Sequence, residues 1–191
     1  MNNLEIEIQV RPEKIEPLLV FLKQEGKFLS ENHQIDDYFV PPHRDFLKER
    51  PLREWLRLRD ADGAYSINYK NWHYDSAGKS LHWADEFESP VQSIEVMKNI
   101  FTALNFKQVV TVRKKRQIWI YKDYEIAIDA VLGLKETIEI EYKGYETDKE
   151  KIIKEMIAFL KDTGCGTLEI GNDGYPFQLL FPAEASFEII K

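Results

Sequence analysis

The sequence predicts an α+β domain in which helices pack outside a mostly antiparallel sheet, and this sheet is expected to be highly curved or closed into a barrel. Most of the 191 residues fall into short stretches where apolar and polar side chains alternate, which is typical of strands with one buried face. Three stretches instead repeat apolar residues at helical spacing. Turn sequences such as Asp60-Ala61-Asp62-Gly63 indicate hairpins and therefore antiparallel pairing.

Three helices are expected where apolar residues recur every three or four positions. The first runs from Pro12 to Gly26, with proline near its start and glycine near its end, where these residues are preferred. The second, Val91 to Leu104, follows a Ser-Pro dipeptide, and the third spans Asp148 to Lys161. Each has one apolar face, so each is expected to pack against the sheet.

Strands are expected where the alternation has period two, because successive side chains in a strand point to opposite faces. The chain opens with such a segment, Leu4 to Val10, and a similar one spans Thr137 to Tyr142. Both place a Glu-x-Glu pair on one face, although acidic residues have low strand propensity, so the pairs suggest a functional reason. The other expected strands are Asp37–Val40, Glu54–Arg59, Tyr65–Trp72, Leu81–Glu88, Val109–Tyr121 and Glu125–Ala130.

The composition is that of one globular domain, and residues 1–191 are expected to form it because no linker or low-complexity tract interrupts them. A hydrophobic content of 43% excludes an intrinsically disordered chain. No apolar run approaches the roughly 20 residues that span a bilayer, so no membrane partner is expected. The single cysteine, Cys165, cannot form an internal disulfide, which favours a cytoplasmic location. The formal charge of −7 argues against non-specific binding to nucleic acid.

Charged residues occur as doublets of like sign, two positions apart on one face of a strand. Three doublets are acidic and two are basic: Glu5/Glu7, Glu86/Glu88, Glu139/Glu141, Arg57/Arg59 and Lys114/Arg116. Any one of these faces could simply contact solvent, as in many half-buried antiparallel sheets. However, like charges on one face repel each other, which folding stability alone does not favour. In a closed sheet the acidic and basic doublets could instead face each other across a lumen.

A lumen that holds both signs of charge suits a polyphosphate accompanied by a divalent metal. Arginine binds phosphate oxygens with a planar fork of donors, and lysine supplies a compact charge. Carboxylates are the ligands that Mg²⁺ and similar cations prefer. The charged faces therefore favour a small-molecule triphosphate as the partner.

Eight fragments, in order along nearly the whole chain, resemble the CYTH superfamily of triphosphate tunnel metalloenzymes, which includes class IV adenylate cyclases and thiamine or inorganic triphosphatases. The fragments are Glu5–Gln9, Asp36–Phe39, Trp55–Arg59, Ile67–Lys70, Glu86–Glu88, Val112–Arg116, Ile128–Leu134 and Ile138–Glu141. The resemblance implies an eight-stranded, closed antiparallel tunnel with helices outside it, and it makes a homodimer plausible. The segment from Gly174 to Leu180 resembles the family's closing tyrosine segment and is expected to plug or pack against the barrel.

The resemblance also implies a role for each charged position. Metal ions, Mg²⁺ or Mn²⁺, would be held by the acidic pairs with one further carboxylate: Glu5, Glu7, Glu139, Glu141 and Asp129. The triphosphate would be bound by Arg57, Arg59, Lys70, Lys114 and Arg116, with Glu86 and Glu88 in positioning roles. The residues expected to take part in catalysis are Glu5, Glu7, Gln9, Lys70 and Arg116. Replacing Glu139 by glutamine should impair turnover far more than folding, because it relieves a like-charge doublet.

The chain departs from the family's opening Glu-x-Glu-x-Lys motif by carrying Gln9 in place of the lysine. Glutamine offers neither a charge nor a base, and a lost charge-assisted contact costs roughly 1.5–3 kcal/mol. This loss is less harmful to cyclisation, where the nucleophile is the ligand's own 3′-hydroxyl, so the favoured reaction is conversion of ATP to cyclic AMP and pyrophosphate. The alternatives are a triphosphatase acting on thiamine triphosphate, inorganic triphosphate or a nucleotide, and a noncatalytic polyphosphate-binding module. In the last case, Gln9→Lys should restore some activity.

Overall fold

The computed structural model describes residues 6–74, 80–171 and 173–191, so Glu5, which is expected at the metal site, lies outside the described part of the chain. The helices are α1 (Glu16–Glu25), α2 (Ile94–Ala103), α3 (Lys149–Asp162) and α4 (Tyr175–Leu180). The strands are β1 (Ile6–Pro12), β2 (Lys27–Val40), β3 (Glu54–Ala61), β4 (Ala64–Tyr74), β5 (Ser80–Pro90), β6 (Lys107–Tyr121), β7 (Tyr124–Val131), β8 (Thr137–Tyr142), β9 (Leu168–Gly171) and β10 (Phe187–Ile190).

The strands form one sheet in the order β10-β9-β1-β8-β7-β6-β2-β3-β4-β5. The hairpins β3–β4, β4–β5 and β6–β7 pair antiparallel, and β1 pairs antiparallel with both β8 and β9. The expected α+β fold with a large antiparallel sheet and few helices is therefore confirmed. Closure of the sheet into an eight-stranded tunnel stays a prediction.

Two compact units divide the chain. Unit 1 contains His33–Arg113, and unit 2 contains the segment that ends at Asn32 together with Lys114–Lys191. Strands β2 and β6 each contribute residues to both units. That residues 1–191 act as a single domain stays a prediction.

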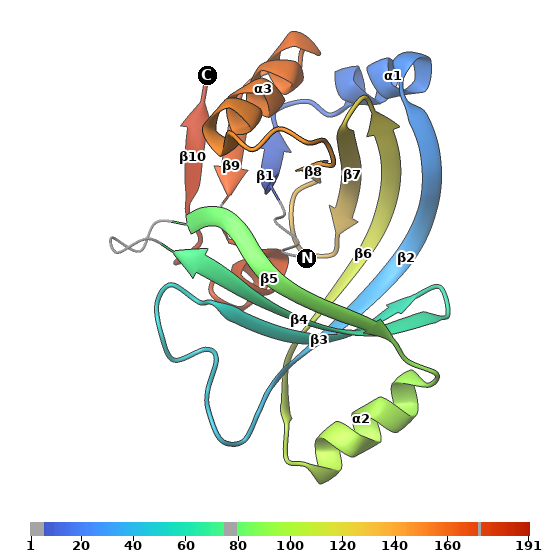
Figure 1. Ribbon diagram of the computed structural model, residues 1–191, viewed down its shortest axis with the longest axis vertical. Coiled ribbons are helices and arrows are strands. Elements are labelled where there is room, and N and C mark those ends of the chain that lie inside the picture. The colour runs from blue at the N-terminus through green and yellow to red at the C-terminus, as the bar shows by residue number, and fades with distance from the viewer. Residues whose placement is uncertain (1–5, 75–79, 172) are drawn as a thin grey trace. The chain divides into compact units, whose positions relative to one another are not determined.

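The core of unit 2 forms on the apolar face of its strands. Ile6, Ile8 and Val10 of β1 are buried together with the isoleucines of β7 and β8. Helices α1 and α3 cover this face (Figure 1), and α3 contributes Met156 and Leu160 to the core. The Asp148 side chain caps α3 by accepting a hydrogen bond from the Lys151 N–H at 3.1 Å. The opposite face of these strands is left for polar side chains.

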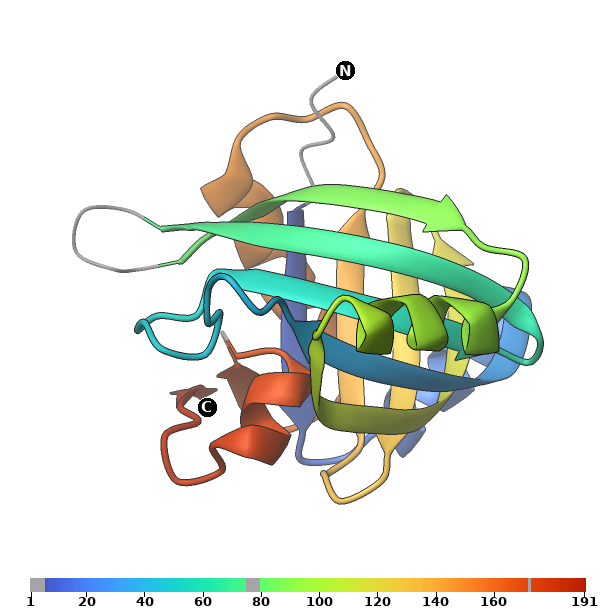
Figure 2. The ribbon, with the colours of Figure 1, turned by 90° about the horizontal axis from the view of Figure 1, so that it is seen from below.

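Unit 1 repeats this division between faces. Phe39 of β2 and Leu58 of β3 pack against Phe101 of α2, which lies along β3 (Figure 2). Ser93 caps α2 by accepting from the Val96 N–H at 3.2 Å. Since neighbouring residues alternate between faces, the arginines of β3 lie opposite this packed side.

The first helix and the second strand begin at other positions than the sequence predicts. Pro12 ends β1 instead of beginning the first helix, which starts at Glu16 with Pro17 in its first turn. Strand β2 begins at Lys27, ten positions before the expected start at Asp37. No helix in the described part of the chain is long and apolar enough to cross a membrane.

Candidate functional site

Unit 1 carries a cluster of charged side chains on one face of β2 to β5, here called the β2–β5 cluster, which comprises Asp36, Arg57, Arg59, Asn68, Lys70 and Glu86. Strand register explains why they meet. Asp36 lies opposite Arg59, Arg57 lies opposite Asn68, and Lys70 lies opposite Glu86. Directly paired residues of adjacent strands point to the same face. The predicted sharing of a face by Arg57 and Arg59 is thus confirmed.

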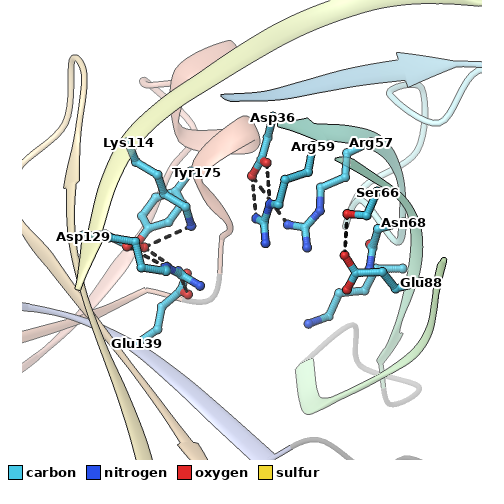
Figure 3. Close-up of polar contacts among 12 residues, drawn as sticks. Asp36, Arg57, Arg59, Ser66, Asn68, Glu88, Lys114, Asp129, Glu139 and Tyr175 are labelled. Carbon is cyan, nitrogen blue, oxygen red and sulfur yellow. Dashed lines mark hydrogen bonds and ion pairs between the residues drawn. The ribbon is translucent and has the colours of Figure 1, made fainter. Parts of the chain in front are cut away.

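The Asp36 carboxylate anchors the two arginines of this cluster. Arg59 donates to it through two N–H groups, Nε to Oδ1 at 2.6 Å and Nη2 to Oδ2 at 2.7 Å (Figure 3). Arg57 Nη1 lies 3.7 Å from Asp36 Oδ2. Asp36 is only 1% exposed. A buried carboxylate with two-point arginine contact is a strong, geometrically defined pair.

Burial by itself would lower the pKa of Arg57, but the nearby Asp36, Tyr38 and Glu86 outweigh burial and raise it, so the guanidinium stays charged. Glu86 accepts from Asn68 Nδ2 at 2.5 Å and lies 3.2 Å from Lys70 Nζ. Arg57 Nη2 lies 3.8 Å from Glu86, which therefore contacts two basic side chains.

Glu88 has a different environment at the end of the same face. It accepts a hydrogen bond from Ser66 Oγ at 2.7 Å and is exposed (Figure 3). The expected pairing of Glu86 and Glu88 in one role is not visible in their contacts.

Unit 2 carries a second cluster, here called the β6–β8 cluster, which comprises Lys114, Arg116, Asp129, Glu139 and Tyr175. Asp129 is fully buried at 0% exposure and accepts from three side chains. These are Lys114 Nζ at 3.1 Å, Arg116 Nε and Nη2 at 2.7 and 2.5 Å, and the Tyr175 hydroxyl at 2.8 Å (Figure 3). The carboxylate is thus saturated by donors, and it fixes the orientation of both basic residues.

Glu139 completes this cluster through a contact with Arg116 Nη2, and it also accepts from Gln9 Nε2 at 3.1 Å. Burial alone would raise the pKa of Glu139, but Arg116 and Lys114, with the hydrogen bonds from Gln9 and Arg116, hold it well below its usual range. Burial, with the charges of Glu139 and Asp129, raises the pKa of Tyr175 well above its ordinary value, so its hydroxyl remains a donor.

Glu141, the other member of that doublet, has the opposite environment. Burial raises its pKa; its partner Lys143, whose Nζ lies 2.5 Å from Glu141 Oε1, opposes this, while Glu7 and Glu125 add to it. Glu7 and Glu125 lie directly opposite Glu141 on the two neighbouring strands. Three carboxylates thus form a row across β1, β8 and β7.

The residues expected to hold a metal ion differ in how well they fit one. Carboxylates such as Glu7 and Glu141 have the oxygen chemistry that Mg²⁺ and Mn²⁺ prefer. Asp129 accepts from lysine, arginine and tyrosine, and Glu139 from arginine and glutamine, whereas Glu141 contacts Lys143. Among the residues that the structure describes, no three His, Cys, Asp or Glu side chains gather as a metal site.

Sequence reasoning missed three residues that organise these clusters. Asp36 lies in a fragment recognised as familiar, yet its contact with Arg59 requires the β2–β3 register. Tyr175 and Gln178 lie in α4 and reach β7 and β1, respectively, over more than 40 residues of sequence. The only sign of these contacts in the sequence is the polar residue at each position, and it does not indicate which residue is contacted.

The fold and its two clusters define the class: an α+β protein whose large antiparallel sheet carries buried arginine–carboxylate networks on one face within each unit. The model of the CYTH domain matches residues 3–169. A Methanocaldococcus jannaschii protein named "Putative adenylate cyclase MJ0240" is 36% identical over 160 residues, which cover 83% of this chain and 88% of that protein. The chain belongs to the CYTH family, whose members act on triphosphates.

Solved structures share the fold of this chain. The PH1819 protein of Pyrococcus horikoshii matches with a TM-score of 0.72 and 24% identity, and the match covers 94% of this chain and 99% of that protein. The Hippeastrum protein HpAC1, described as an adenylyl cyclase candidate with a dominant triphosphatase activity, has a TM-score of 0.65 with 17% identity and covers 94% of this chain and 96% of its own.

Proposed function

We propose that this protein is a metal-dependent enzyme that binds a nucleoside or other organic triphosphate and converts ATP to cyclic AMP and pyrophosphate, as a class IV-like adenylate cyclase. The observation that carries the proposal is the pair of buried anchors, Asp36 and Asp129, each of which holds an arginine through two N–H groups. Such anchors fix arginines in advance, which reduces the entropy lost when an anion binds.

The anchored arginines retain capacity for a ligand. A guanidinium has five N–H groups, and the contact between Arg59 and Asp36 uses two nitrogen atoms, Nε and Nη2. The other N–H groups of Arg59 can bind phosphate oxygens. Arg57, Lys70, Lys114 and Arg116 add further positive charge, which suits a ligand with about four negative charges.

Closure of the sheet into a tunnel is part of this proposal. The family resemblance implies it. In the cyclase reaction the ribose 3′-oxygen attacks the α-phosphorus and pyrophosphate leaves. The basic side chains would orient the chain of phosphates for in-line attack and stabilise the charge that develops on the leaving pyrophosphate.

A divalent metal bound by Glu7 and Glu141, together with Glu5, would neutralise phosphate charge when present. The contacts of Asp129 and Glu139 favour a different role for these two carboxylates. They hold Lys114 and Arg116 in the orientation in which those residues bind the ligand.

A triphosphatase is the second candidate, because a protein of the same fold from Hippeastrum is described as having dominant triphosphatase activity. Gln9 favours the cyclase, since its amide donates to Glu139 and cannot act as a base toward water. Incubation with ATP and Mg²⁺ or Mn²⁺ separates the candidates. Cyclic AMP plus pyrophosphate supports the cyclase, whereas ADP plus phosphate supports the triphosphatase. Triphosphate binding without turnover would leave the noncatalytic module.

A further inference from the structure

Gln9 belongs to a continuous chain of side-chain hydrogen bonds within unit 2. Arg11 Nη2 donates to Gln178 Oε1 at 2.5 Å. Gln178 Nε2 donates to Gln9 Oε1 at 2.7 Å and also to the Asp173 carbonyl at 2.5 Å. Gln9 Nε2 in turn donates to Glu139 Oε1 at 3.1 Å. The chain therefore runs from Arg11 through α4 to the β6–β8 cluster.

The donor and acceptor groups at its ends fix the direction of every hydrogen bond in this row. A guanidinium can only donate, so the atom of Gln178 that faces Arg11 must be its oxygen. A backbone carbonyl can only accept, so the atom that faces Asp173 must be the Gln178 nitrogen. Gln178 must then donate to Gln9, and Gln9 has its own nitrogen left for Glu139. If either amide were flipped, a donor would face a donor and an acceptor would face an acceptor.

The surroundings hold the start of the chain in place. Gln178 is only 2% exposed. The Arg11 guanidinium lies over the Phe187 ring, 4.0 Å from its centre. Gly171 lies opposite Gln9 on β9, and a Cβ there would come within 2.9 Å of the Phe187 ring. Glycine at this position therefore lets Phe187 pack close to β9.

We propose that Arg11 and Gln178 are positioning residues that direct the Gln9 amide to Glu139, and that this site is built for glutamine rather than lysine at position 9. The inference rests on the proposed function and deepens it. A lysine at position 9 would bring an ammonium group against the Gln178 N–H, and Gln178 cannot turn away because Arg11 and Asp173 fix it. For the noncatalytic alternative, the sequence predicts that Gln9→Lys restores some activity, and the present inference predicts the opposite.

The test compares Gln9→Lys, Gln178→Glu and the double variant in the full chain. Gln9→Lys is expected to lower the affinity for inorganic triphosphate, and kcat/KM, by about tenfold, the effect of one charge-assisted hydrogen bond. Gln178→Glu alone turns the Gln9 amide away from Glu139 and should also impair binding. In the double variant the new lysine donates to Glu139 and to the new carboxylate, so affinity should recover.

A matched control is Gln117→Lys, which adds the same charge to a strand glutamine that donates to Glu31 at 2.7 Å. Triphosphate affinity should change little in this variant. An increase in affinity in Gln9→Lys alone, or simply additive effects at positions 9 and 178, would overturn the inference. Variants with lower thermal midpoints but unchanged affinity and kcat/KM would show that these hydrogen bonds have only a structural role. That result would also overturn the inference.

Thermal midpoints keep the inference testable if the proposed function fails. If the wild-type protein neither binds nor converts triphosphate, Gln9→Lys should still lower the midpoint, and Gln178→Glu should partly compensate for it. Recovery remains partial because the new carboxylate cannot donate to the Asp173 carbonyl. Midpoint changes that simply add would show that positions 9 and 178 are not coupled, and the inference would fall.

Discussion

Glu139 and Glu141 are two positions apart on one strand, yet their environments predict opposite responses to removal of charge. Glu139 contacts Arg116 and accepts from Gln9, and its pKa is held low by these cationic and amide partners. Burial and the facing Glu7 and Glu125 raise the pKa of Glu141. Neutral glutamine should therefore destabilise the fold at position 139 and be tolerated, or even stabilise it, at position 141.

The expected magnitude follows from the contacts. Arg116 keeps Asp129 as a partner when Glu139 is replaced, so the loss is that of hydrogen bonds to a charged group, roughly 1.5–3 kcal/mol, rather than that of an isolated buried ion pair. In a chain of this length this corresponds to a fall in Tm of roughly 3–12 °C. Glu141→Gln is the matched control, with no fall in Tm expected.

Thermal and urea unfolding of the two variants provide the assay. The reasoning is refuted if Glu139→Gln is as stable as the wild type, or if Glu141→Gln is the more damaging change. The sequence-based expectation that Glu139→Gln would impair turnover far more than folding came from treating the doublet as repulsive. The structure corrects its premise, because Arg116 and Lys114 lie near Glu139.

Four further outcomes are expected. Because the pKa of Glu139 is lowered in the folded state, its stabilising contribution is complete above about pH 4.3 and is lost as the pH falls toward the folded-state pKa. In urea unfolding at acid pH, the difference in unfolding free energy between the wild type and Glu139→Gln should therefore narrow as the pH falls. A difference that stays constant would refute the lowered pKa of Glu139. Asp36→Asn removes the buried carboxylate that two half-buried arginines contact. It should cost roughly 1.5–3 kcal/mol in urea unfolding, more than Asp37→Asn, whose ion-pair partner Lys98 is more exposed; equal losses would argue against the anchor. Tyr175→Phe removes one of the donors to Asp129 and should lower Tm by about 2–4 °C, the effect of about 1 kcal/mol, and an unchanged Tm would show that the hydroxyl contributes nothing. EDTA should abolish turnover and Mg²⁺ or Mn²⁺ should restore it, whereas turnover that survives chelation would remove the metal from the proposal.

The sequence predicted correctly which side chains share a face of a strand, because side chains in a strand alternate between its two faces. The sharing of a face by Arg57 and Arg59, opposite the buried Leu58, follows from local geometry alone. The same holds for the buried isoleucines of β1 and β8 that alternate with Gln9 and Glu139.

Partners across strands were harder to predict because they depend on register. Asp36 meets Arg59 only because β2 and β3 pair at that offset. The beginning of β2 was missed because apolar and polar residues do not alternate in its sequence from Lys27 onward, although exposure does alternate there in the structure. The short strands β9 and β10 lie in the C-terminal region, where no strand was expected.

The role of α4 illustrates the limit most clearly. Its residues were expected to pack against the sheet, but nothing local indicates that Gln178 would bind Gln9, 169 positions earlier in the chain. From the sequence alone, the missing lysine at position 9 predicted a lost charge-assisted contact, which is less harmful to cyclisation than to hydrolysis. In the structure, Gln9 is one member of a hydrogen-bond network in which its amide oxygen and nitrogen both have partners.

The most direct test of the account is calorimetric titration of inorganic triphosphate, with Mg²⁺, into the wild type, Arg59→Met, Arg116→Met and the double variant. If the basic side chains of each cluster bind the triphosphate, each single variant should lose about tenfold or more in affinity. Undiminished affinity in a single variant would contradict the role of that variant's cluster in binding the triphosphate.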